Sequence, residues 1–190
     1  MVTPVSPWLA DSPWLVGSLS ITKAALGAVE ADAIARYGSD EEACGYICGP
    51  AGDVLCDETV PLQNLANKLH KLDPETYFRT GRTFFAFNEK KFDDAVTHAK
   101  TNGRPAKVLY HSHLDAGAYF SPTDSAVLSF GEPPSTEGGE AKLGPGPQWP
   151  LAFLVTSVRK GDCPAPLIDD HKLFVWAGAA FVESTFVVID

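Results

Sequence analysis

The sequence lacks any long apolar run, and this absence sets the first limit on the class of protein. None of its 190 residues falls in an uninterrupted apolar stretch of about 18, the length that a transmembrane helix needs. The first twenty residues have no basic start, and three prolines interrupt any helix there, so we expect no secretory signal. We therefore expect a cytoplasmic protein that does not associate with a membrane.

Basic residues are few relative to acidic ones. The chain has 15 Lys and Arg against 24 Asp and Glu, which gives a formal net charge of −9. It contains no basic run, and an acidic surface repels the phosphate backbone of nucleic acids. Nucleic acid is therefore not an expected partner, whereas proteins and small molecules remain open.

Cysteine is also scarce, with only Cys44, Cys48, Cys56 and Cys163. Without a secretory signal, reduced thiols are expected rather than disulfides. Cys44 and Cys48 are four residues apart and do not form a Cys-x-x-Cys motif. Packing in the core is therefore the favoured role for these side chains.

A chain of this length with 45% apolar residues is expected to fold as one domain. We expect residues 1–20 to be an irregular lead-in and residues 21–190 to form the domain, with a flexible Gly- and Pro-rich insertion at about 131–150. The order of predicted elements indicates an α/β (α+β) fold with a mixed β-sheet flanked by helices. Apolar periodicity and turn residues predict helices at about 21–37, 89–101 and from Ser121 onward, and strands at about 43–49, 53–60, 83–87, 106–112, 151–158, 171–178 and 179–189.

The stretch "YHSHLDAGAYFSPTD", residues 110–124, contains the strongest chemical signal. His111 and His113 lie at i and i+2 on a predicted strand, so their side chains point to the same face. Two imidazoles on one face can bind one metal ion, and a carboxylate is the natural third ligand. Asp124, in the first turn of the next predicted helix, can reach back to them. Three such ligands on zinc leave one position for water.

Each of these residues also has an explanation that needs no metal. Two surface histidines can fall at this spacing by chance. Asp124 near a helix start interacts favourably with the helix dipole, and Ser121 followed by Pro122 forms an ordinary N-cap. The residues alone therefore leave a metal site and a plain polar patch both open.

The same stretch fits a longer pattern of His, Ser or Thr, His, seven residues, Ser, two residues and Asp. This pattern resembles the signature of the JAMM (MPN-plus, JAB domain) zinc metalloproteases, which include deubiquitinating isopeptidases and bacterial sulfur-carrier proteases. That family also has an upstream Glu-x-x-Gly, which "EACGYICG" supplies from Glu42 to Gly45. Asn64 fits a polar position after the second strand, and the likeness extends over about residues 20–160.

The resemblance implies a three-layer, cytidine-deaminase-like fold and a role for each motif residue. His111, His113 and Asp124 would bind Zn²⁺. Glu42, rather than its neighbour Glu41, would be the general base. Ser121 would donate a hydrogen bond to the oxyanion as well as capping its helix. Ser112 would order the backbone.

The resemblance also implies a substrate. Family members cut amide or isopeptide bonds after an extended C-terminal tail that often ends in Gly-Gly, and segments 61–82 and 131–150 would form the walls of the groove for that tail. The compact chain looks like the short bacterial forms, which process ubiquitin-like sulfur carriers. A deubiquitinase-like isopeptidase and a catalytically inactive MPN scaffold remain alternatives, and a homodimer remains open.

A purine or pyrimidine deaminase is the rival from another enzyme class, because it shares a related layered architecture. Such enzymes use a His-x-Glu and a Pro-Cys-x-x-Cys pattern to bind zinc. Neither "GDCPAP" nor "EACGYIC" matches that pattern, so this reading is disfavoured.

Overall fold

The computed structural model describes residues 11–16, 18–136, 138–161 and 165–190. A six-stranded mixed sheet with the order β4-β2-β5-β6-β7-β8 forms its centre, and only the β5–β6 pair within it is parallel. In chain order these strands are β2 (Cys44–Cys48), β4 (Glu58–Leu62), β5 (Ala106–Leu114), β6 (Ala152–Arg159), β7 (Leu167–Trp176) and β8 (Phe181–Ser184).

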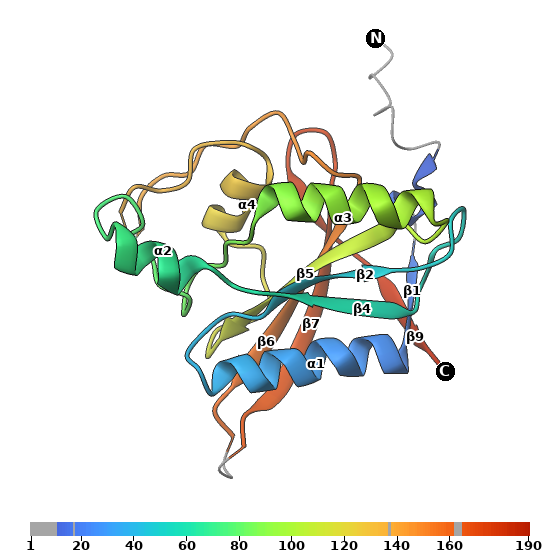
Figure 1. Cartoon of the computed structure of the whole chain (residues 1–190), viewed down its shortest axis with the longest axis horizontal. Helices are drawn as coiled ribbons and strands as arrows, with labels where there is room; N and C mark the ends of the chain where they lie inside the picture. The colour runs from blue at the N-terminus through green and yellow to red at the C-terminus, as the bar shows by residue number, and fades with distance from the viewer. Residues whose placement is uncertain (1–10, 17, 137, 162–164) are drawn as a thin grey trace.

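Helices cover both faces of this sheet and create three layers (Figure 1). Helix α1 (Lys23–Tyr37) lies on one face, and α3 (Glu89–Thr101) and α4 (Pro122–Leu128) lie on the other. Every residue of β2 and β5 is buried, because these central strands have a packed layer on each side. The expected mixed sheet flanked by helices is confirmed.

A second sheet of three parallel strands, in the order β3-β1-β9, closes one end of the molecule. Its strands are β1 (Leu19–Thr22), β3 (Leu55–Cys56) and β9 (Phe186–Ile189). Residues 1–10 of the expected irregular lead-in lie outside the described residues. Its described part contains regular structure, since β1 begins at Leu19 and the 3-10 turn η2 (Pro13–Leu15) buries Trp14. Helix α1 begins at Lys23 rather than at residue 21 because the Thr22 hydroxyl caps it, accepting the Ala25 N–H at 3.1 Å.

Other expected elements need correction. The apolar stretch 83–87 is not a strand, and the connection 61–82 contains helix α2 (Ala66–Leu72). The expected strands 53–60 and 179–189 each divide into two, because the chain crosses from one sheet to the other at Asp57 and at Thr185. None of the helices in the described part of the chain is long and apolar enough to cross a membrane.

The cysteines behave as core residues where the structure describes them. Cys44, Cys48 and Cys56 are free and buried, and Cys163 lies outside the described residues. Burial raises the pKa of the Cys44 and Cys56 thiols to about 12 and that of Cys48 to about 11. Such thiols stay protonated at neutral pH and are poor nucleophiles.

Candidate metal centre

Strand β5 positions the two histidines of the motif. His111 and His113 alternate with Ser112 along the strand, so both imidazoles project to one face of the sheet and their Nε2 atoms are 3.2 Å apart. Both side chains are buried, with 1% of His111 and 5% of His113 exposed. The two histidine side chains near the end of β5 are therefore enclosed within the protein.

Helix α4 brings the carboxylate to the same point. Its start is a capping box in which the Ser121 hydroxyl accepts the Asp124 N–H at 3.1 Å and Asp124 Oδ2 accepts the Ser121 N–H at 3.0 Å. The same Oδ2 atom lies 3.4 Å from the Nε2 atoms of both His111 and His113. Helix capping therefore fixes the orientation of the carboxylate toward the two imidazoles.

The spacing of these three atoms fits zinc. Ligands at about 2.0–2.1 Å from a tetrahedral zinc ion are about 3.3 Å from one another. The three distances among His111 Nε2, His113 Nε2 and Asp124 Oδ2 are 3.2, 3.4 and 3.4 Å. Among the described residues, this is the one group of three or more His, Cys, Asp or Glu side chains whose potential ligand atoms converge.

The protonation states also suit a cation. His113 Nδ1 lies 3.0 Å from the Gly117 carbonyl oxygen, which makes Nδ1 the N–H donor and directs Nε2 toward the site. Burial lowers the pKa of His111, so its imidazole is neutral at neutral pH. Although burial opposes it, contact with the two imidazoles holds the pKa of Asp124 well below its usual range. A neutral imidazole and an ionised carboxylate, as in His111 and Asp124, are the forms that bind zinc.

His111 has no other polar partner that would explain its position. Its Nδ1 atom is buried and has no hydrogen-bond partner among the described residues, and Phe85 stacks on the ring with centroids 4.6 Å apart. The polar contacts of this ring therefore lie at Nε2, which faces His113 and Asp124. A buried ring with this arrangement favours a metal ligand over a plain polar patch.

Glu42 stands beside this group, immediately before β2. Its side chain is 5% exposed and lines a cleft of about 310 Å³ together with His113, Ser121 and Asp124. Burial, and then the negative charge of Asp124, raise the pKa of the Glu42 carboxyl well above its ordinary value, while Arg79 acts in the opposite direction. A carboxyl with a raised pKa in a cleft is typical of a group that exchanges protons.

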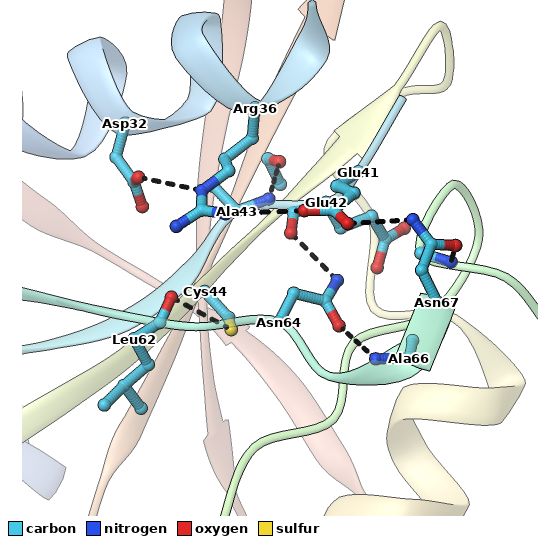
Figure 2. A network of polar contacts seen from close by, with 12 residues as sticks. Asp32, Arg36, Glu41, Glu42, Ala43, Cys44, Leu62, Asn64, Ala66 and Asn67 are labelled. Atoms are coloured by element: carbon cyan, nitrogen blue, oxygen red, sulfur yellow. Dashed lines mark hydrogen bonds and ion pairs between the residues drawn. The ribbon is translucent and has the colours of Figure 1, made fainter. Parts of the chain in front are cut away.

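The backbone around Glu42 is held from both sides. The Glu42 N–H donates to the Gly81 carbonyl at 2.6 Å, and its carbonyl accepts from Asn64 Nδ2 at 3.0 Å (Figure 2). The Ser112 hydroxyl accepts the Ala43 N–H at 2.8 Å, which ties the start of β2 to the residue between the two histidines. The expected backbone-ordering role of Ser112 is confirmed, and Asn64 has a comparable role.

Glu41 does not point into the cleft. Its carboxylate accepts from Asn67 Nδ2 at 2.8 Å and from Arg36 at 3.4 Å (Figure 2). The two neighbouring glutamates therefore have separate functions, and only Glu42 lies beside the histidines.

Several cleft residues were not predicted individually. Arg79 and Arg82 come from the segment 61–82, and Tyr119 packs edge-on against His113 with ring centroids 4.9 Å apart. Pro134, Gly138 and Gly139 come from the segment 131–150. Both segments that were expected to form walls thus line the cleft, but no motif marks which of their residues do so.

A family model matches the part of the chain that contains the motif residues. The family model described as prokaryotic homologs of the JAB domain matches residues 29–136, which is more than half of the chain. This range contains Glu42, both histidines, Ser121 and Asp124. The search of curated proteins found no match.

Two solved structures, from Desulfitobacterium hafniense and Salinibacter ruber, show a similar fold at low sequence identity. A protein from Desulfitobacterium hafniense is 18% identical, with 90% of this chain and 93% of that chain covered and a TM-score of 0.53. A protein from Salinibacter ruber is 19% identical, with 90% and 92% covered and a TM-score of 0.50. A JAB1/MPN domain protein from Archaeoglobus fulgidus is 14% identical, with 90% and 98% covered and a TM-score of 0.43.

Proposed function

The chain belongs to the prokaryotic homologs of the JAB domain, and from this premise we propose that it is a zinc-dependent metallopeptidase. Its substrate would be an amide bond in the C-terminal tail of a ubiquitin-like protein of the sulfur-carrier type. The observation that carries the proposal is the convergence of His111, His113 and Asp124 at zinc-ligand spacing, beside the buried carboxyl of Glu42.

Zinc, when bound to these three side chains, would lower the pKa of a coordinated water and polarise the scissile carbonyl. Glu42 would take a proton from the attacking water and pass it to the leaving amine. Its buried position in the cleft beside His113 and Asp124 suits both steps. In the net reaction, a carbon–oxygen bond forms to water and the carbon–nitrogen bond of the amide breaks.

Ser121 would stabilise the negative charge that develops on the scissile carbonyl oxygen. Its oxygen accepts the Asp124 N–H in the helix cap, and that bond does not use the hydroxyl hydrogen. Because Ser121 lines the cleft, the hydroxyl can donate to the oxyanion while the cap persists. A donor of this kind typically contributes about 2.7–4 kcal/mol to transition-state stabilisation.

The cleft supports a narrow, extended substrate. Its volume of about 310 Å³ suits a few residues without bulky side chains, as in a Gly-Gly tail. Residues of the segments 61–82 and 131–150 line it together with the motif residues. A tail that binds in such a cleft is expected to bind in an extended conformation.

A combined metal and activity experiment tests the proposal. Protein purified without chelator should contain about one zinc per chain, and His113→Ala should lose this zinc because three ligands are needed to hold it. Glu42→Gln should keep the zinc and lose hydrolysis of a ubiquitin-like protein extended by residues after Gly-Gly. His98→Ala, which removes an exposed histidine on α3, should change neither property.

The alternatives give different results in the same assay. Zinc that depends on His113 without cleavage of any fusion would indicate an inactive MPN scaffold. Cleavage of lysine-linked conjugates in preference to linear extensions would indicate a deubiquitinase-like isopeptidase. Hydrolysis that survives Glu42→Gln would place the general base elsewhere.

A further inference from the structure

Arg79 is a cation in the cleft whose charge lowers the pKa of Glu42, but no contact with the substrate has been assigned to it so far. It lies in the segment between α2 and α3 and lines the cleft together with Glu42 and His113. Its side chain is half-buried, and the guanidinium lies over the Phe78 ring at 5.0 Å from the centroid. Among the described residues, no carboxylate forms an ion pair with Arg79, and no hydrogen bond occupies its guanidinium.

The second arginine of the cleft is in a different state. Arg82 forms ion pairs with Asp40 and with Asp115, the latter at 2.9 Å, so two carboxylates within the protein neutralise it. Through the pair with Asp115, Arg82 connects the segment before α3 to the loop that follows β5. Arg79 has no such structural task, although the chain as a whole has an excess of acidic residues.

An unpaired guanidinium beside reacting groups suits an anionic part of the substrate. Arginine binds a carboxylate through two parallel N–H···O bonds, and partial burial strengthens such a pair relative to one on the open surface. If the residue that leaves is the last of its chain, its α-carboxylate is one carbon atom away from the scissile nitrogen. That carboxylate then lies close to the reacting groups, and Arg79 lines the same cleft.

Building on the proposed function, we propose that Arg79 determines specificity by binding the α-carboxylate of a single C-terminal leaving residue. The chain then prefers a single terminal residue after the Gly-Gly end over a longer extension. An isopeptide bond to lysine places an aliphatic chain at this position and no carboxylate, so Arg79 disfavours conjugates of that kind. Water adds to the glycine carbonyl, the carbon–nitrogen bond breaks, and the free amino acid leaves with its carboxylate intact.

A binding experiment tests this inference without depending on catalysis. The zinc-loaded Glu42→Gln protein is titrated with two short peptides that end in Gly-Gly-Ala, one with a free carboxylate and one with a C-terminal amide. We expect the free acid to bind about tenfold more tightly than the amide. The additional change Arg79→Gln should bring the two affinities together, and Arg79→Lys should restore only part of the preference, because lysine lacks the planar fork.

Lys68→Gln is the matched control, because it removes one positive charge from an exposed position on α2 that does not line the cleft. It should leave the tenfold preference unchanged. Equal affinity for the two peptides, failure of the free acid to bind at millimolar concentration, or a preference that survives Arg79→Gln would overturn the role of Arg79. Failure of the proposed function is distinct from these results, since it appears as wild-type protein that does not cleave the carrier fusion.

Discussion

At the scale of single residues, the buried carboxyl of Glu42 lies near a second carboxylate, Asp124, and both influence the stability of the metal-free protein. Asp124 is held ionised by two imidazoles and by the Ser121 N–H. Glu42 has no such donor to its side chain among the described residues, and its pKa is raised by burial and by Asp124. The ionised form of Glu42 is therefore destabilising unless a cation or a proton is near.

Replacing Glu42 by Gln should stabilise the metal-free protein at neutral pH, by about 1–3 kcal/mol, because the amide carries no buried charge. A raised pKa means that the folded state binds the proton more tightly than the unfolded state. The contribution of Glu42 to wild-type stability should then be largest below the ordinary glutamate pKa and should be lost as pH rises through the folded-state value. Urea unfolding of both proteins in chelator, from acidic to neutral pH, measures this difference.

The expected difference in the free energy of unfolding between wild type and Glu42→Gln disappears at acidic pH, where Glu42 is protonated in the folded and in the unfolded state. A Gln variant that is less stable than wild type at neutral pH, or a gap that does not change with pH, would contradict this interpretation. Glu41→Gln is a suitable control, since the Glu41 carboxylate accepts hydrogen bonds from Asn67 and Arg36 and its removal should not stabilise the protein.

The close approach of His111, His113 and Asp124 could be predicted because local rules set their positions. The pleat of a strand sets the direction of the two histidines, and the capping box sets that of the carboxylate. Arg79 could not be predicted in the same way. Its place in the cleft depends on the path of a long connection. No periodic pattern in the sequence predicts that path.

At the scale of elements, the stretch 83–87 is extended and apolar but does not join the sheet. Asn64 uses its side chain in place of a strand partner, donating to the Phe84 carbonyl at 3.1 Å and accepting the Ala86 N–H at 3.2 Å. Leu65 adds a backbone bond to the Ala86 carbonyl at 2.7 Å. The composition that predicted a strand is explained by burial of Phe85 against His111, not by a ladder of backbone pairs.

Asn64 should therefore be more important for stability than its single side chain suggests. It also donates to the Glu42 carbonyl and accepts the Ala66 N–H at 2.9 Å (Figure 2). With the bonds to Phe84 and Ala86 it satisfies four backbone groups from three segments. Asn64→Leu should lower the free energy of unfolding by about 2–4 kcal/mol, because buried donors and acceptors lose their partner. Chemical denaturation of the zinc-loaded protein measures the loss.

Asn67→Leu provides the comparison. Asn67 bonds to the Glu41 carboxylate and to the Gly81 N–H but is only half-buried, so water can replace these bonds and the loss should be smaller. If the two variants are equally stable, Asn64 does not organise the segment as described. The Asn64 variant should also lose a larger fraction of its activity than of its zinc content. Asn64 positions the backbone of Glu42 and contacts none of the three proposed ligands.

At the scale of the whole molecule, the three-stranded sheet joins segments from both ends of the chain. Strand β9 pairs with β1 in parallel over four residues, from Leu19 opposite Phe186 to Thr22 opposite Ile189. Sequence patterns indicated strand character at 179–189 but not the change of sheet at Thr185. Parallel pairing between distant segments is set by the packed core and leaves no local signal in the sequence.

Deletion of residues 186–190 should destabilise this end of the protein without removing the metal centre. Leu19 and Ile21 of β1 are fully buried, and Phe186 packs against the same core, so the deletion exposes apolar surface and one edge of β1. We expect a loss of about 2–4 kcal/mol and a lower Tm. Zinc content below the transition should stay near that of the full chain, because the proposed ligands lie on β5 and α4.

Asp190→Ala removes only an exposed ion pair with Lys23 and should leave Tm unchanged. An equal fall in Tm for both variants would therefore show that β9 pairing is not the cause.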